Sequence, residues 1–233
     1  MILQLEDRED DILNQFMNHN KNICKKNNLE YVRKKTSTFH VPPYWGKVFE
    51  LRRLMDENPQ TPFFMWMDSD AFFINFTNEK FTNFIQTHLD KSMIISKDMP
   101  PWSKGEFNAG VFIVKNDSIG KNILEYWISL YKKENWTFNG SWSTHGEWAG
   151  EVYEQGSFKK HVLPKYRQHI KHLDYYYLNN NNPRKNNEAI AVHLAGSFKN
   201  DKNIRNIFFK PRIQWYYILI VLLICIFFIL YFK

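Results

Sequence analysis

The feature that most constrains the fold is a short apolar run followed by two acids. Phe63 to Met67 are all apolar, Pro62 precedes them, and Asp68 and Asp70 follow. A continuous apolar run of this length, bounded by a proline and by acids, is typical of a strand buried on both faces of a parallel sheet. In open α/β sheets, ligands bind at the carboxyl ends of such strands, which is where the two acids stand.

The spacing of Asp68 and Asp70 indicates a cation site. Side chains at i and i+2 of an extended chain point to the same side, so we expect the two carboxylates to converge. The apolar flanks Trp66–Met67 and Ala71–Ile74 leave little water to solvate them, and adjacent carboxylates repel each other. A hard divalent cation that carries a phosphate would neutralise both. The alternative, a pair of solvated acids, is disfavoured by these flanks.

The order of elements predicts one α/β domain over residues 1–212. We expect strands at residues 2–5, 29–32, 63–67, 93–95, 110–114 and 189–192. Apolar stripes predict helices after residue 10 and around residues 48–55, 81–89 and 119–131. This alternation is typical of a doubly wound, mostly parallel sheet flanked by helices. Residues 133–158 and 164–188 show no clear period, and a long irregular segment in a compact domain often carries function.

Composition narrows the class of ligand. The net charge is +7, which suits nucleic acid, an anionic membrane surface or phosphorylated small molecules. The sequence has no zinc-ligand cluster and no regular basic–aromatic interleaving, so we predict that it does not bind nucleic acid. Cys24 lies in a basic stretch and Cys225 in an apolar one, and we expect no disulfide between them.

Residues 213–233 are expected to form a membrane anchor. Trp215 to Phe232 is a run of 18 residues without a charge, enough for about 27 Å of helix. Aromatic residues lie at both ends of the run, and basic residues precede it. The alternative is a buried core helix, which an all-round apolar segment fits less well. By the positive-inside rule the domain at residues 1–212 would face the cytosol, with a lumenal Golgi or endoplasmic reticulum face as the alternative.

Two further segments carry chemistry at predicted strand ends. Asn108-Ala109-Gly110 offers an amide beside small residues that permit close approach to the backbone. His193 closes the last predicted strand, and Gly196 and Lys199 follow it. An imidazole can complete a mixed oxygen and nitrogen shell that favours manganese over calcium, and a lysine can neutralise a phosphate. The alternative for a single histidine at a strand end is a structural role. The long loop adds four polar candidates: Glu147, Glu151, Glu154 and Gln155.

These residues carry a resemblance to glycosyltransferase family 34, which includes fungal Golgi galactosyl- and mannosyltransferases and plant xyloglucan xylosyltransferases. The similar segments are residues 45–55, residues 66–75 with the Asp-Ser-Asp motif, residues 108–116, and Glu154-Gln155. His193 to Lys199 also resembles the His-x-x-Gly-x-x-Lys segment of glycogenin-like enzymes. The resemblance covers roughly residues 1–200.

The resemblance implies a GT-A fold, a nucleotide-sugar donor (UDP-sugar before GDP-sugar), and Mn²⁺ or Mg²⁺. Asp70 would bind the metal, Asp68 the metal or the ribose, and His193 would complete the shell. Lys199, with Gly196, would hold the diphosphate. The implied activity is transfer of a hexose or pentose to a glycan or glycoprotein hydroxyl, with retention of configuration.

The same resemblance assigns the remaining residues around the sugar. Lys47 and Asp98 would contact the donor, and Asn108 would face its sugar. Gln155 would lie near the anomeric carbon, with Glu154 or Glu151 on the acceptor side. The chain differs from these relatives in two expected features, since their anchor is N-terminal and several have lumenal disulfides.

Two other functions fit parts of the sequence. Phosphatases of the haloacid-dehalogenase class also place Asp-x-Asp after an apolar strand, but they need a small or hydroxyl residue where Phe72 stands, and a later acidic pair. A tail-anchored scaffold that keeps the fold without activity is the non-enzymatic alternative.

Overall fold

The computed structural model describes residues 1–98, 106–181, 188–196 and 200. Met1–Gly196 forms one compact unit. Lys199 and the predicted anchor at residues 213–233 lie outside the described residues. Within the described ranges, no helix has the length and apolar character needed to cross a bilayer.

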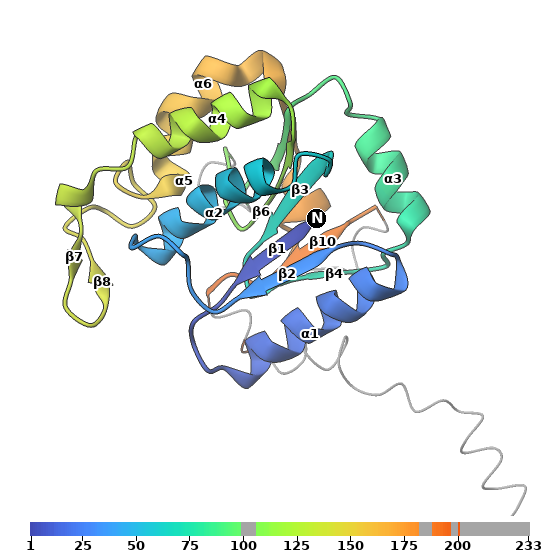
Figure 1. Ribbon diagram of the computed structural model, residues 1–233, viewed down its shortest axis with the longest axis horizontal. Coiled ribbons are helices and arrows are strands. Elements are labelled where there is room, and N and C mark those ends of the chain that lie inside the picture. The colour runs from blue at the N-terminus through green and yellow to red at the C-terminus, as the bar shows by residue number, and fades with distance from the viewer. Residues whose placement is uncertain (99–105, 182–187, 197–199, 201–233) are drawn as a thin grey trace, which may run out of the picture. The chain divides into compact units, whose positions relative to one another are not determined.

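A six-stranded mixed sheet forms the centre of this unit (Figure 1). Its strands, in spatial order, are β2 (Tyr31–Lys34), β1 (Ile2–Leu5), β3 (Phe63–Met67), β6 (Val111–Lys115), β5 (Met93–Ser96) and β9 (Ile170–Leu173). Only β6 runs antiparallel to its neighbours, and the other adjacent pairs are parallel. The predicted mixed, mostly parallel sheet is therefore confirmed for the described residues.

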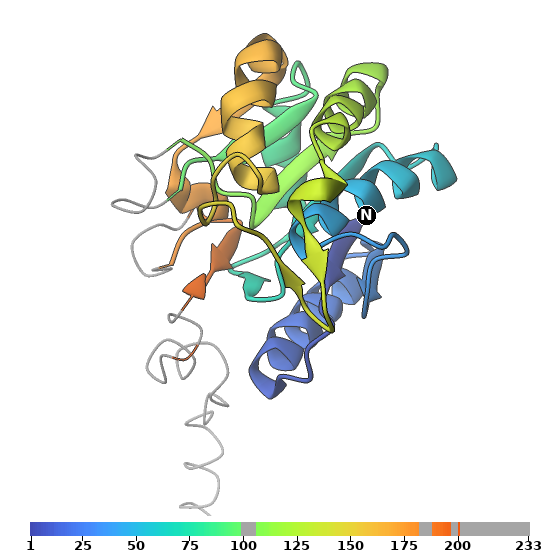
Figure 2. The ribbon, with the colours of Figure 1, turned by 90° about the vertical axis from the view of Figure 1, so that its left-hand side faces the viewer.

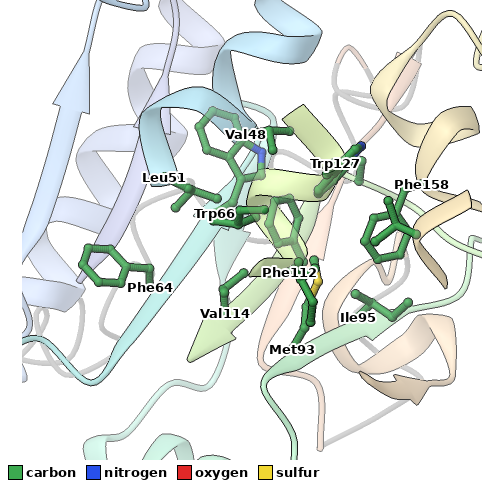
Figure 3. Packing of buried hydrophobic residues seen from close by; sticks show 14 of the residues in the cluster. Val48, Leu51, Phe64, Trp66, Met93, Ile95, Phe112, Val114, Trp127 and Phe158 are labelled. Atoms are coloured by element: carbon green, nitrogen blue, oxygen red, sulfur yellow. The ribbon is translucent and has the colours of Figure 1, made fainter. Parts of the chain in front are cut away.

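Helices cover both faces of the sheet, as the continuous apolar run of β3 requires. Phe64 and Trp66 belong to the core on one face, and Met65 and Met67 to the core on the other. The first face packs against α2 (Pro43–Glu57), α4 (Ser118–Ser129), a π-helical turn (Phe158–Val162) and α6 (Leu163–Tyr166). The short helix α5 (Glu154–Ser157) leads directly into the π-helical turn. The second packs against α1 (Asp11–Lys26), α3 (Asn78–Gln86) and α7 (Tyr175–Leu178). Figure 3 shows aromatic and aliphatic side chains filling the first core.

A second, two-stranded sheet lies on the α1 side. Strand β4 (Ala71–Phe73) pairs antiparallel with β10 (Ala191–His193), and His193 lies opposite Ala71. Phe16 of α1 stacks on Phe72 at 4.9 Å between ring centroids. The sequence did not predict Ala71–Phe73 as a strand. This pairing brings the end of the described chain to the segment that directly follows the two acids.

Element boundaries differ from the predictions in two informative places. Strand β2 begins two residues later than the predicted residue 29, and Asn28, just before that residue, takes a positive φ of 54°. Strand β9 lies inside residues 164–188, where no period was visible. Only Ile170 and Leu173 of this edge strand are buried, so its side chains show no alternation.

The long segment at residues 133–158 contains a hairpin and short helical turns. Strands β7 (Thr137–Phe138) and β8 (Trp142–Ser143) pair antiparallel, and a 3₁₀ turn occupies Lys133–Asn135. A second 3₁₀ turn, Arg167–His169, lies in the other irregular segment, residues 164–188. Figure 1 shows the hairpin projecting from the body near the first turns of α2, and Figure 2 shows it from the side on which it projects, in front of the body. The prediction of an irregular segment is right for its turns and wrong for this hairpin.

A buried carboxylate on α2 ties that helix to the segment after β2. The Glu50 side chain is fully buried and lies 2.8 Å from Lys34 Nζ and 3.0 Å from Arg53 Nη2. The hydroxyl and backbone N–H of Thr38 also donate to it. Although burial opposes ionisation, the hydrogen bonds from Lys34, Thr38 and Arg53 lower the pKa of Glu50 to about 2. The helix that carries Lys47 is thereby fixed to the edge of the sheet.

We predict that Glu50→Gln lowers the free energy of unfolding at pH 7 by on the order of 3 kcal/mol. Because the folded pKa lies below the ordinary value of 4.5, the stabilisation is complete above about pH 4.5 and is lost as the pH falls toward 2. Urea denaturation of both proteins across this range measures the difference. Glu57→Gln, at the exposed partner of Arg53, is the matched control and should cost less than about 1 kcal/mol. A difference for Glu50→Gln that stays constant with pH would contradict the assignment.

Candidate functional site

Three potential metal ligands converge beside the carboxyl end of the central strand β3. Ligand atoms of Asp68, Asp70 and His193 all lie within 4.8 Å of one another. His193 Nε2 is 3.2 Å from Asp70 Oδ1 and 3.9 Å from Asp68 Oδ2. The pairing of β10 with β4 causes this convergence, since the backbone N–H of Leu194 donates to Asp70 O at 3.0 Å. The structure thus brings together the three residues that the sequence assigned to a metal.

The two acids converge through a turn. The backbone N–H of Ala71 donates to Asp68 O at 2.9 Å, which closes a tight turn over Ser69 and Asp70. The expectation of an extended chain at this point was therefore wrong, because the backbone reverses direction before β4 begins. The expected convergence of the two carboxylates is confirmed.

A buried network of amide side chains holds this turn. Gln4 Nε2 donates to Asp68 O at 2.9 Å, and Asn20 Nδ2 donates to Ala71 O at 2.9 Å. Asn20 also donates to Gln4 Oε1, which accepts a second bond from the Tyr31 hydroxyl at 2.8 Å. Because these buried groups satisfy one another, the network specifies a single backbone path for the acids. The sequence analysis missed all three side chains, whose only signal is their polarity at otherwise apolar positions.

A second set of contacts orients the imidazole of His193. Its Nδ1 lies 3.1 Å from Asn179 Oδ1, and Asn179 Nδ2 donates to Ser96 Oγ at 2.6 Å. The Asn179 oxygen can only accept, so Nδ1 carries a hydrogen and Nε2 faces the acids. Burial lowers the pKa of His193, but the carboxylates of Asp70 and Asp68 outweigh it, and the net pKa is raised.

Glycine at position 110 makes room for this ring. A Cβ at Gly110 would lie 2.0 Å from His193 Cε1. The small residues at 109–110 in the sequence predicted close approach of another group to the backbone, and the approaching group is this imidazole.

Lys47 supplies a buried positive charge next to the acids. Its Nζ lies 2.9 Å from Asp68 Oδ1, 3.3 Å from Glu154 Oε1 and 3.2 Å from Ala109 O. Burial lowers the pKa of Lys47, but Asp68 and Glu154 outweigh it and raise the pKa, so the ammonium stays charged. Trp66 Nε1 also donates to Asp68 Oδ1 at 2.7 Å. Asp68 is therefore held on one side by protein donors and faces His193 on the other.

The antiparallel direction of β6 brings further predicted site residues to the carboxyl ends of its neighbouring strands. The amino end of β6 meets the carboxyl ends of β3 and β5. Asn108 Nδ2 donates to Asp98 Oδ1 at 3.0 Å, and Asn108 Oδ1 accepts from Gly110 N at 2.7 Å. Gln155 Oε1 accepts from Ala109 N at 2.9 Å. Asp98, Asn108 and Gln155 thus lie around one short segment beside the metal cluster.

The remaining predicted site residues do not belong to the metal cluster of Asp68, Asp70 and His193. Glu154 is buried against Lys47, and burial raises its pKa. Glu151 lies at the surface, 2.5 Å from Lys160 and 2.6 Å from His161. Gly196 has a φ of 66°, a left-handed conformation that favours glycine. The role predicted for Lys199 concerns a residue outside those that the structure describes.

A pocket opens beside Asp68 and Asp70. It is lined by the carboxyl ends of β1 and β3 and by the first turns of α2: Leu5, Glu6, Asp7, Arg8, Pro43, Tyr44, Lys47, Trp66, Asp68, Ser69 and Asp70. Glu6 accepts two bonds from the Arg8 guanidinium, at 2.7 and 2.6 Å, one from the Arg8 backbone N–H at 2.8 Å, and one from the Ser69 hydroxyl. The sequence analysis did not assign Glu6, Arg8 or Tyr44. The signal for the first two was their place directly after the first predicted strand.

The donor set fits a hard divalent cation. Two carboxylates and one imidazole match the ligands that Mn²⁺ takes in proteins, and Mg²⁺ accepts the carboxylates. The hydrogen bond from His193 Nδ1 leaves Nε2 as the nitrogen directed at the acids, as ligation requires.

Comparison with known proteins agrees with this chemistry. Residues 3–106 match the model of the galactosyl transferase GMA12/MNN10 family. "Probable glycosyltransferase 2" of Oryza sativa subsp. indica and subsp. japonica is 32% identical over 94 residues, which is 39% of this chain and 19% of each relative. The chain thus matches about a fifth of the length of these curated relatives. The predicted resemblance is confirmed for the matched segment.

The fold has a counterpart among solved structures. A glycosyltransferase involved in the glycosylation of the major capsid of PBCV-1 superposes with a TM-score of 0.66 and 20% identity, over 88% of this chain and 98% of that one. At this identity the match establishes a shared fold. The expected glycosyltransferase fold is therefore confirmed.

We predict that Gly110→Ala destabilises the protein by about 1–3 kcal/mol, because the new methyl group overlaps the His193 ring. His193→Ala removes the ring, so Gly110→Ala should cost markedly less in that background. Chemical denaturation of the two single variants and the double variant measures the coupling. An equal cost of Gly110→Ala in both backgrounds would show that the ring and the glycine do not constrain each other.

Proposed function

We propose that this chain is a metal-dependent glycosyltransferase that moves a hexose or pentose from a nucleoside-diphosphate sugar to a hydroxyl of a glycan or glycoprotein. The observation that carries the proposal is the convergence of Asp68, Asp70 and His193 beside a polar pocket. The match of residues 3–106 to a glycosyltransferase family and the shared fold support it.

Asp68, Asp70 and His193 would hold the divalent cation, with Mn²⁺ favoured by the imidazole. When bound, the cation supplies positive charge that stabilises the departing diphosphate. Asp68 is oriented for this task by Lys47 and by the indole N–H of Trp66.

The pocket is the proposed site of the nucleoside diphosphate. It is continuous with Asp68 and Asp70, so a nucleoside in it would direct its phosphates toward the acids. Its wall includes the hydrogen-bonded group of Glu6, Arg8 and Ser69, which offers polar contacts to a base or ribose. A UDP-sugar is proposed before a GDP-sugar on the family resemblance. Lys199, with Gly196, is proposed to bind the diphosphate.

Asn108, Asp98 and Gln155 are proposed to surround the transferred sugar. Their side chains are fixed by bonds to one another and to the start of β6, which gives a rigid wall beside the metal cluster. The oxocarbenium-like sugar gains stability from nearby amide and carboxylate oxygens.

Glu154 acts, in this proposal, mainly by sharing Lys47 with Asp68. Glu151 is the weakest candidate because it pairs with Lys160 and His161 at the surface. Retention of configuration rests on the family resemblance.

The test is turnover of sugar nucleotides by the full chain. With Mn²⁺, we expect hydrolysis of one member of a panel of UDP- and GDP-linked glucose, galactose, xylose and mannose, measured as release of the nucleoside diphosphate. In addition, Mn²⁺ should increase the thermal shift produced by UDP or GDP, because the cation would bridge protein and diphosphate.

Asp70→Asn should abolish both the turnover and the Mn²⁺-dependent part of the shift, while the midpoint of the unliganded protein changes little. Asp90→Asn, at an exposed acid paired with Lys91, is the matched control and should behave as the wild type. A full Mn²⁺-dependent shift in Asp70→Asn would contradict the metal assignment. Binding of UDP and Mn²⁺ without turnover of any donor would favour the non-catalytic scaffold.

We further propose that residues 213–233 anchor the chain in a membrane with the catalytic domain in the cytosol. The uncharged run and its aromatic borders support the anchor, and the basic residues that precede the run support the cytosolic placement of the domain. A soluble reporter fused to residues 213–233 should sediment with membranes and resist extraction by alkaline carbonate. A fusion that remains in the soluble fraction would show that the segment is not an anchor.

A further inference from the structure

An aromatic cluster with one exposed member adjoins the pocket. Tyr44 of α2, Trp148 and Tyr153 contact one another edge to face, with ring centroids 5.1–5.3 Å apart. Trp136 packs behind them, 5.1 Å from Tyr153. The Trp148 side chain is 68% exposed, which is high for an indole in the described part of this chain. We call Tyr44, Trp148 and Tyr153 the aromatic platform.

The platform is continuous with the proposed catalytic site. Tyr44 belongs both to the platform and to the wall of the pocket that contains Asp68. Tyr153 directly precedes Glu154, whose carboxylate contacts Lys47. A molecule lying on the platform would therefore border the pocket at Tyr44 of α2.

The backbone holds Trp148 in its exposed position. The N–H of Gly150 donates to Glu147 O at 2.9 Å, which closes a tight turn with Trp148 and Ala149 at its centre. Ala149 has a φ of 56°, an unfavourable conformation for a residue with a side chain. The next residues are fixed to the body, since Trp45 Nε1 donates to Val152 O at 3.0 Å. The indole contacts Tyr44 and Tyr153 through its edges and faces but leaves most of its surface open, and an unfavourable backbone conformation that keeps it so is typical of a ligand-binding residue.

We propose that the aromatic platform binds a pyranose ring of a neutral glycan acceptor. This inference rests on the proposed function and specifies the chemical class of the acceptor in that reaction. A pyranose presents a face of C–H groups, whose partial positive charge suits the negative face of an aromatic ring. One exposed indole beside two partly buried tyrosines is about the size of a sugar ring and far too small for a stable protein interface.

The experiment measures binding of oligosaccharides to the full chain. The probes are neutral hexasaccharides of β-1,4-glucan, β-1,4-xylan, α-1,4-glucan and α-1,6-mannan, titrated by ligand-observed NMR. We expect at least one to bind. Trp148→Ala should raise its Kd by about tenfold, the order expected when one stacked ring is lost, and Trp148→Phe should restore most of the affinity.

Two controls separate this surface from the donor site. Leu89→Ala removes another exposed apolar side chain, 47% exposed, from the opposite edge of the sheet, and should leave oligosaccharide binding unchanged. Asp70→Asn should lose the Mn²⁺-dependent binding of UDP and keep oligosaccharide binding, so failure of the metal assignment is distinguishable from failure of the platform.

Three outcomes would overturn the inference. These are no binding of any of the four hexasaccharides to the wild type, equal affinity of the wild type and Trp148→Ala, and a larger effect of Trp148→Ala on UDP than on the oligosaccharide. The last outcome would assign the platform to the nucleobase of the donor.

Discussion

The candidate site depends on the antiparallel pairing of β4 with β10. This pairing sets His193 opposite Ala71 and joins Leu194 to Asp70 through the backbone. The imidazole thereby reaches two carboxylates that precede it by more than a hundred residues in sequence. Because backbone hydrogen bonds fix strand register, the distance between imidazole and acids is set by the fold and not by side-chain flexibility. The loss of this small sheet would separate the ligands while leaving the six-stranded sheet intact.

The acids are tolerated near the core because their charges are matched locally. Lys47 and the Trp66 N–H contact one oxygen of Asp68, while the ring of His193 lies against Asp70. Carboxylates without such partners would be costly at this depth. The amides of Gln4 and Asn20 then fix the backbone between the acids. Electrostatics explains why the acids can lie here, and the amide network explains why they adopt one arrangement.

The sequence predicted the parts of the fold that depend on local pattern. The apolar run 63–67 identified the central strand, because a strand that is buried on both faces is apolar at every position. The acids directly after the run identified the metal cluster. It could not predict the β4–β10 pairing, since Ala71–Phe73 is too short to show a period. Edge strand β9 was not visible either, because only Ile170 and Leu173 are buried and its side chains therefore do not alternate between apolar and polar. Tyr44 and Trp148 meet only in the folded chain, so no spacing rule could have joined them.

The absence of a side chain at Gly110 also constrains how the sequence can change during evolution. The space beside this glycine is filled by the His193 ring, so the two positions cannot diversify independently. Among homologous chains, a larger residue at the first position should appear only where the second has already become small. The order of such changes is thus constrained: ligand loss must come first, and a lineage that then filled the gap could not regain the histidine by a single reversion.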